Sequence, residues 1–145
     1  MNITKEEYAK MAKKASPKSK VLTDTLLAFL IGGGICVIGE FILEGFKYFG
    51  FSLSSSAAWT SIILIGVSAT LTGLGLFRGI AKHSGAGTLV PITGFANAVA
   101  SSAIEAKSEG YILGVGAKIF TIAGPVIAYG TLASVIYGLV YYFIN

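Results

Sequence analysis

Long apolar runs separated by short charged clusters dominate the sequence. Three runs carry no charged residue: 48–77 is thirty residues long, 84–104 is twenty-one and 119–145 is twenty-seven. A helix needs about 20 predominantly apolar residues to cross a bilayer. With a further apolar run at 21–43, the pattern predicts an all-α fold. We expect a polytopic integral membrane helical bundle of about four spans (residues 21–145) behind an N-terminal arm (residues 1–20).

The first span is expected at 21–43 and has three adjacent glycines in its middle. Glycine weakens a helix in water by about 1 kcal/mol relative to alanine, but in a membrane it permits close backbone approach or a bend. We therefore assign helix packing or bending to Gly32, Gly33 and Gly34. Cys36 is expected to be a small buried apolar residue.

The second span is expected at 57–77, after a polar connection at 44–56. Gly75 and Gly79 lie four residues apart, which suits tight contact along one helix face. A short basic loop follows this span.

Two interpretations compete for the run 84–104, which is uncharged but only moderately apolar and contains Pro91. It is either a full third span with a polar lining, which we favour, or a broken, re-entrant element. Membranes tolerate the latter only where protein covers it or where it lines water.

The final region, 111–144, would be about 51 Å long as a straight helix, which exceeds one bilayer crossing. Pro125 offers a natural break. Either a short helix precedes Pro125 and a longer one follows it, or a single span from about 119 to 143 is kinked there.

The N-terminal arm holds six lysines. Residues 4–16 have the spacing of a short amphipathic helix, with Thr4 and Glu7 as a capping box and Ile3 and Tyr8 as a hydrophobic staple. Such a helix would lie on the membrane with its lysines toward anionic headgroups. The alternative is a solvated basic tail.

The cations of the chain also predict an orientation. Six lie in the arm, Lys47 alone follows the first span, and Arg78 and Lys82 follow the second. By the positive-inside rule, the N-terminus and the loop 78–83 face the cytoplasm.

Composition narrows the function classes. Apolar residues make up 54% of the chain and charged residues 12%, with one Cys and one His. One Cys and one His cannot supply the four ligands of a zinc site, and one Cys cannot form an internal disulfide framework. So few charges argue against a soluble enzyme. The net charge of +4 lies almost wholly in the arm, so we expect no nucleic-acid partner, no metal and no cofactor.

Polar residues that repeat every four positions form the candidate functional site. Thr93, Asn97, Ser101 and Glu105 would form one slowly drifting polar stripe on a helix. Polar side chains at membrane depth are costly unless they pair or meet water. The stripe is therefore either a substrate path or an inter-helix hydrogen-bond seam, and both interpretations remain open.

The same stretch carries a family resemblance. The block 85–110, GAGTLVPITGFANAVASSAIEAKSEG, resembles the shared segment of the stage V sporulation AC/AE membrane protein family. The basic start YAKMAKKASP at 8–17 and the glycine run of the first span resemble the same family. The resemblance covers essentially the whole chain.

This resemblance implies a place in the spore inner membrane, in the system that moves dipicolinic acid as its calcium chelate. Uptake would occur into the developing spore and release on germination, with mechanosensitive behaviour. The implied partners are the AE membrane subunit, the soluble AD subunit and the lipid bilayer, in an oligomer. The family offers no catalytic residues to carry over.

We therefore expect a pore-forming or pore-lining subunit. Conduction would be passive, because no phosphate-binding loop of the Gly-Lys-Ser/Thr type is present. Glu105 would lie at one mouth of the path, and Arg78 and Lys82 at the other. The rival is a non-conducting membrane scaffold that anchors the other subunits, and an enzyme is a distant third.

Overall fold

The structure, a computed structural model, describes residues 4, 5, 7, 8, 11, 12 and 20–144. These residues are helical or in turns, with no strand among them, which confirms the all-α prediction. In the arm, the Thr4 backbone N–H donates to the Glu7 carboxylate (3.1 Å) and the Glu7 N–H donates to the Thr4 hydroxyl (3.3 Å). This is the expected capping box, and its hydrogen bonds hold the pKa of Glu7 below its usual value. The expected staple involves Ile3, outside the described residues.

Two long antiparallel helices form the frame. Helix α2 (Val21–Tyr48) and helix α3 (Leu53–Gly73) are joined by the short turn 49–52. Ser52 caps α3 by accepting from the Ser55 N–H (3.3 Å). Both helices are long and apolar enough to cross a membrane. The first runs five residues past its predicted end, and the second begins and ends four residues earlier than predicted.

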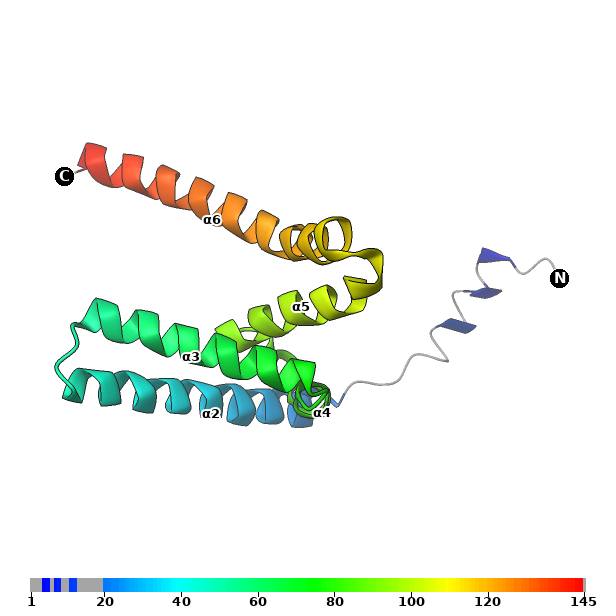
Figure 1. Ribbon diagram of the computed structural model, residues 1–145. Helices are drawn as coiled ribbons and strands as arrows, with labels where there is room; N and C mark the ends of the chain where they lie inside the picture. The colour runs from blue at the N-terminus through cyan, green and yellow to red at the C-terminus, as the bar shows by residue number, and fades with distance from the viewer. Residues whose placement is uncertain (1–3, 6, 9–10, 13–19, 145) are drawn as a thin grey trace.

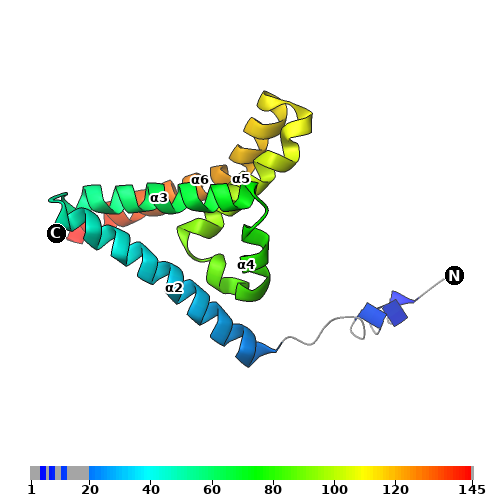
Figure 2. The ribbon, with the colours of Figure 1, turned by 60° about the horizontal axis from the view of Figure 1, so that its bottom comes forward.

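The hairpin opens like a V away from this turn, and a short element fills the opening (Figure 2). Helix α4 (Phe77–Ser84) and the 3₁₀ turn η1 (Gly85–Thr88) follow α3, and helix α5 (Ile92–Glu105) follows them. The turn η1 packs against α2, and α5 packs along α3. We call α4, η1 and α5 together the wedge.

Helix α5 runs parallel to α3. The Ser68 hydroxyl donates to the Thr93 carbonyl oxygen (2.6 Å), and one turn later the Thr72 hydroxyl donates to the Asn97 amide oxygen (2.8 Å). Because both partners advance by four residues, the two helices point the same way. The wedge therefore enters the bundle from the end where α3 finishes and leaves it at that same end (Figure 1).

This arrangement decides between the two interpretations of 84–104. Helix α5 has 14 residues, or about 21 Å at 1.5 Å per residue, too short for the roughly 30 Å hydrocarbon core. Three segments qualify as spans by length and composition, and 84–104 is not among them. The favoured full third span is wrong, and the re-entrant alternative fits. The physical reason is local: Gly85 has a positive φ of 50°, and Pro91 restarts the helix as the residue before its first turn.

The chain then turns back across the bundle. The 3₁₀ turn η2 (Ala106–Glu109) and the π turn η3 (Tyr111–Gly116) lead into helix α6 (Ala117–Ile144), which contains Pro125. This agrees with the second interpretation of the region, a single span through Pro125. Helix α6 starts at the end of the bundle where α2 starts, and it runs to the opposite end (Figure 1).

The predicted pairing of Gly75 with Gly79 does not occur. Helix α3 already ends at Gly73, and Gly75 adopts a positive φ of 72° in the turn that follows. Gly79 lies in the next helix with open space beside it. Gly75 therefore serves the turn between α3 and α4, because glycine adopts this conformation without a steric cost.

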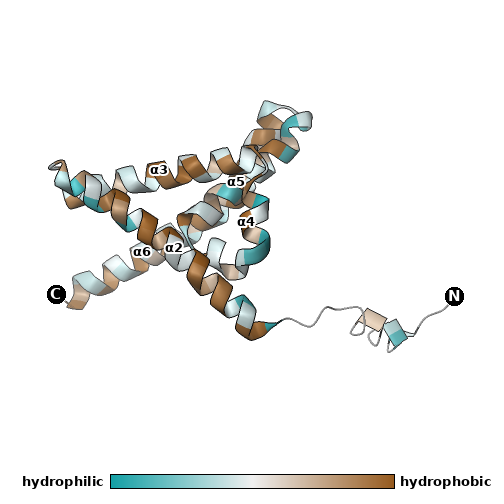
Figure 3. Ribbon diagram, turned by 90° about the horizontal axis from the view of Figure 1, so that it is seen from below, coloured by the Kyte–Doolittle hydropathy of each residue, from teal (hydrophilic) through white to brown (hydrophobic). Residues whose placement is uncertain are grey.

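The distribution of apolar and hydrophilic residues agrees with this arrangement of the helices. Apolar residues cover α2 and α3, whereas hydrophilic residues gather on α4 and in the turn after α5 (Figure 3). No described residue of α2 or α6 is fully buried within the chain. Such faces suit lipid or neighbouring chains rather than water.

The re-entrant course predicts a labelling pattern. Single cysteines at Lys82, Ser108 and Ser54, each in a Cys36→Ala background, are treated with a membrane-impermeant thiol reagent in sealed vesicles. Lys82→Cys and Ser108→Cys should react from the same face, because the wedge returns to its starting end. Ser54→Cys, at the far end of α3, should react only from the opposite face.

A full span at 84–104 would give another pattern. Lys82→Cys and Ser108→Cys would then be labelled from opposite faces, which would contradict the re-entrant geometry. The comparison does not depend on which face is cytoplasmic.

Candidate functional site

The wedge is the candidate site because its backbone leaves regular helix inside the bundle. Gly87 of η1 packs against α2, seven to eleven residues into that helix, at Ala28 and Gly32. A Cβ on Gly87 would overlap the Ala28 carbonyl oxygen and lie 2.9 Å from the Ala28 Cα. The absence of a side chain is thus what lets the turn touch the helix.

Only one glycine of the α2 run takes part in this contact. A Cβ on Gly32 would lie 3.0 Å from the Gly87 carbonyl oxygen, whereas Gly33 and Gly34 have nothing within 4 Å. Successive helical residues point about 100° apart, so three adjacent glycines cannot all face one neighbour. Close packing within the chain is therefore a property of Gly32 and not of Gly33 or Gly34. Cys36, expected to be buried, is exposed.

The wedge is closed internally by further tight contacts. The hydroxyls of Ser84 and Thr88, both buried, lie 2.8 Å apart and join the end of α4 to η1. Gly94, in the first turn of α5, lies against the carbonyl oxygens of Thr88 and Leu89, where a Cβ would overlap the former. Pro91 is the N-cap residue of α5 and leaves that end without a side-chain cap.

Small hydroxyl residues line one face of α3, and two of them, Ser68 and Thr72, bond α5. Ser56, Thr60, Ser68 and Thr72 repeat every four or eight residues along α3, and the first three are buried. Small polar residues let membrane helices approach closely and bond across the contact. Ser68 and Thr72 meet the first half of the predicted polar stripe at Thr93 and Asn97.

The second half of that stripe lies elsewhere. The Ser101 hydroxyl is exposed and donates only to the Ala98 carbonyl oxygen of its own helix (3.2 Å). Glu105 is exposed and borders a polar hollow of about 170 Å³ with Glu109 and Lys118. Periodicity predicted one face, but α5 extends beyond the end of α3, so its later residues have no partner on that helix.

The residues predicted for the two mouths of the substrate path do not lie at opposite ends of the helical bundle. Arg78 and Lys82 are on α4, at the same end of the bundle as Glu105, because the wedge returns to that end (Figure 1). Most charges of residues 20–144 gather there: Lys20, Asp24, Arg78, Lys82, Glu105, Lys107, Glu109 and Lys118. The other end holds Glu40, Glu44 and Lys47, with Lys47 paired to Glu44.

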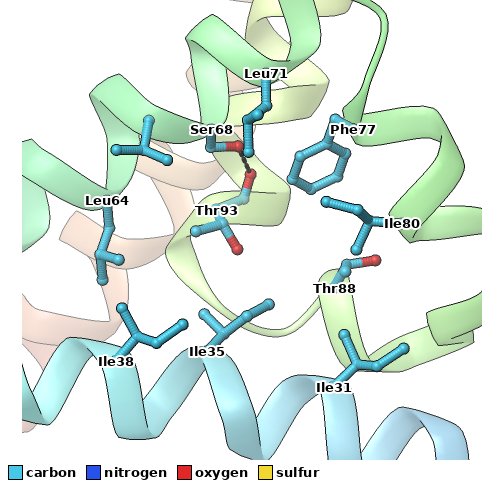
Figure 4. Close-up of a pocket in the computed structure, with 11 residues that line it drawn as sticks. Ile31, Ile35, Ile38, Leu64, Ser68, Leu71, Phe77, Ile80, Thr88 and Thr93 are labelled. Atoms are coloured by element: carbon cyan, nitrogen blue, oxygen red, sulfur yellow. Dashed lines mark hydrogen bonds between the residues drawn. The ribbon is translucent and has the colours of Figure 1, made fainter.

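A partly enclosed cavity of about 220 Å³ lies where the wedge meets the hairpin (Figure 4). Its walls are mainly apolar: Ile31, Ile35 and Ile38 of α2, Leu64 and Leu71 of α3, and Phe77 of α4. Ser68, Thr88 and Thr93 also border the cavity, but only apolar atoms are accessible from it. The first two are hydrogen-bonded, whereas the buried Thr93 Oγ1 has no partner among the described residues.

The described residues hold no group of three or more His, Cys, Asp or Glu side chains placed for a metal ion. What the wedge offers is a buried contact surface, a cavity and an uncapped helix end. These features suit passage or binding within a membrane.

Sequence reasoning overlooked three residues of the site: Ser68, Thr72 and Gly87. Ser56, Thr60, Ser68 and Thr72 are spaced by four or eight residues, which resembles the pattern that marked α5. The spacing was visible in the sequence, but the bonds of Ser68 and Thr72 to α5 were not. Gly87 was one of nineteen glycines, and only its contact with α2 distinguishes it.

The fold and the wedge define a class: a helical membrane protein with three spanning helices and one re-entrant element. Residues 24–140 match the family described as SpoVAC/SpoVAEB sporulation membrane protein. The chain is also 41% identical to stage V sporulation protein AC of Bacillus subtilis (strain 168) over 141 residues, 97% of this chain and 94% of the relative. The chain therefore belongs to the SpoVAC/SpoVAEB sporulation membrane protein family. No solved structure matches it.

Replacing Gly87 tests the contact that holds the wedge against α2. In Gly87→Ala the new methyl group would overlap the Ala28 carbonyl oxygen. Overpacking of this kind costs about 1–3 kcal/mol, so we expect a lower free energy of unfolding in detergent, measured by denaturant titration.

Gly33→Ala is the matched control, because that position has open space. It should leave stability unchanged or raise it by up to about 1 kcal/mol, the helix-propensity difference. Equal stability of the two variants would mean that η1 does not rest on α2.

Asn97→Val tests the seam between α3 and α5. The Thr72 hydroxyl would lose the Asn97 amide oxygen but keep the Ser68 carbonyl oxygen (2.8 Å). We therefore expect a modest loss of about 0.5–1.5 kcal/mol in the same titration. Ser101→Ala, which removes an exposed hydroxyl of the same helix, is the control and should have little effect. Unchanged stability together with altered solute flux would instead assign Asn97 to a water-filled path.

Proposed function

We propose that this chain is a channel subunit of the spore inner membrane that moves dipicolinic acid, as its calcium chelate. It would act in uptake by the developing spore and in release on germination, with mechanosensitive opening. Membership of a sporulation membrane protein family supports the setting. The substrate follows from the family resemblance of the sequence.

The observation that carries the proposal is the re-entrant wedge. Irregular backbone at membrane depth is tolerated where it is buried in protein or lines a water-filled cavity. Channels and transporters place such broken helices where the solute passes. A scaffold would need only continuous spans, so the wedge favours a transport role.

The start of α5 supports an anionic solute. This helix begins inside the bundle, and no side chain caps it. A helix N-terminus carries about half a positive elementary charge and attracts carboxylates. Dipicolinate has two carboxylates, and calcium reduces their charge in the chelate.

The cavity beside α5 is not the path in this proposal. No charged residue lines it, and the partial charge at the α5 N-terminus would offset only a small part of the hydration that an anion loses there. We assign Thr93 and Asn97 to the wall of the wedge, against α3. The path would follow the exposed face with Ser101 and Glu105, completed by neighbouring subunits.

Orientation follows from the charges. Five of the six cations among residues 20–144 are at the end where α2 begins. The positive-inside rule supports a cytoplasmic position for this end, for the N-terminus and for α4. Helix α6 would then finish on the opposite side.

The proposed channel is an oligomer with the AE membrane subunit and the soluble AD subunit. Among the described residues, helix α6 packs mainly on α5 and η3, and it has no fully buried residue. Its apolar surface is available for lipid and for other membrane chains.

Flux measurement tests the proposal directly. The purified full chain is reconstituted in liposomes loaded with calcium dipicolinate, and escape is followed by terbium luminescence sensitised by dipicolinate. We expect release several-fold above that of protein-free liposomes, with a further rise after osmotic downshift. Gly87→Ala should reduce it, because the wedge no longer seats on α2, whereas Gly33→Ala should not.

The second candidate is the non-conducting scaffold. The exposed surface of α6 favours it, because a long apolar helix with no fully buried described residue can contact other subunits. If the chain gives no release alone or with the AE subunit, yet retains that subunit in a pull-down from detergent, it is a scaffold and the channel proposal fails.

A further inference from the structure

We propose that Glu40 of α2 faces the aqueous path between neighbouring copies of this chain and attracts a divalent cation there. This inference rests on the channel function proposed above, and it adds a residue of the path and the part of the solute that this residue recognises. Three features support it: the depth of Glu40 in the membrane, the face of α2 on which it lies, and the absence of a counter-charge at that depth among residues 20–144.

Glu40 is the deepest of the three charged residues in the far half of α2. A Cβ on the preceding residue, Gly39, would lie 3.5 Å from the Leu64 Cδ1. Leu64 is the twelfth of the 21 residues of α3, a helix about 31 Å long that matches the roughly 30 Å hydrocarbon core. Glu40 is therefore level with the centre of a spanning helix.

The aromatic pair near the turn gives the same depth. The rings of Phe46 and Trp59 stack with their centroids 6.3 Å apart, and a tryptophan near the end of a span is typical of the headgroup level. Glu40 lies six residues before Phe46, or about 9 Å further along the helix axis. A glutamate side chain is too short to reach the headgroups from there.

The face of α2 that carries Glu40 is turned away from the rest of the chain. Glu40 is exposed, as are Cys36 and Val37 one turn before it and Glu44 one turn after it. A Cβ on Gly33, two turns before Glu40, would have no atom within 4 Å. This face lies opposite the one that packs on α3, so its surroundings are supplied from outside the chain.

No cation among residues 20–144 can neutralise Glu40. Lys47, two turns away, is paired with Glu44, and the other cations of these residues lie at the opposite end of the bundle. A second copy that packed through the same face would bring another carboxylate. A charged side chain at this depth faces either a partner of opposite charge or a water-filled cavity, so water fits this face.

A carboxylate in an aqueous path favours cations. Rings of glutamate side chains from neighbouring subunits select cations in channels, and carboxylate oxygens are the preferred ligands of calcium. Glu40 would thus attract the calcium ion of the chelate, whereas the N-terminus of α5 would attract its carboxylates.

The single cysteine of the chain, Cys36, serves as the reporter. Residues one turn apart have Cβ atoms about 5–6 Å apart, so Cys36 senses the charge of Glu40. The full chain in liposomes, alone and with the AE subunit, is treated with a cationic and an anionic methanethiosulfonate reagent. The cationic reagent should react faster, and Glu40→Gln should lower the ratio of the two rates about three- to tenfold, the effect of one unit charge at this distance in water. A change in the thiolate fraction of Cys36 cancels in this ratio.

Two further measurements complete the test. Ile62→Cys in a Cys36→Ala background should stay unreactive, because Ile62 is an exposed residue at the same depth on α3, a helix without charged residues. Calcium chloride should slow the cationic reagent at Cys36 in the wild type more than potassium chloride of equal ionic strength does. In Glu40→Gln the two salts should act alike.

The outcomes separate this inference from the channel function. An unreactive Cys36 would overturn the inference, and release of calcium dipicolinate from the same liposomes would leave the channel function intact. A rate ratio that Glu40→Gln does not change would also overturn it, because Glu40 would then be protonated in lipid or paired with another subunit. Equal slowing by calcium in both chains would exclude the divalent cation. The expected ratios in liposomes that release no solute would support an aqueous site at Glu40 and contradict the channel function.

Discussion

A polar backbone inside a bilayer must find its partners within protein, and the arrangement of this chain depends on that constraint. The wedge carries a 3₁₀ turn and the beginning of a helix into the bundle. It can do so because Gly87 lies directly on Ala28 of α2 and because the Ser68 hydroxyl bonds the Thr93 carbonyl. The first contact places the turn against α2 instead of lipid, and the second ties the start of α5 to α3.

The hairpin of α2 and α3 leaves an opening in which the wedge packs. Helices α2 and α3 meet at the short turn 49–52 and diverge toward the other end, where α4 and η1 fill the opening (Figure 2). The described chain thus consists of a packed part, the hairpin with its wedge, and one long apolar helix, α6, that packs mainly on α5 and η3. A subunit built this way has an internal core at one end and a long apolar surface that other components of the membrane must cover. Both features are consistent with a component of a larger membrane assembly.

The sequence predicted the membrane class, the two helices of the hairpin and, as one of two alternatives, the long helix through Pro125, because these depend on the length of apolar runs. Element boundaries were less accurate, and Gly75 was assigned to a helix that had already ended at Gly73. The polar stripe on α5 was visible as a spacing of four residues. Its division into a part that bonds α3 and a part that stays exposed was not visible, because it depends on where α3 ends beside it.

Apolar length and charge asymmetry are properties of the chain itself, and they determined by themselves that this protein crosses a membrane with a basic N-terminal arm. They also singled out 84–104 as a stretch too polar to meet lipid, without deciding its course. Only the tertiary structure decided that this stretch is re-entrant, and that Gly32 packs while Gly33 does not. The physical reason is that a close contact needs two partners, and the partner of Gly32 is Gly87, fifty-five residues further along the chain.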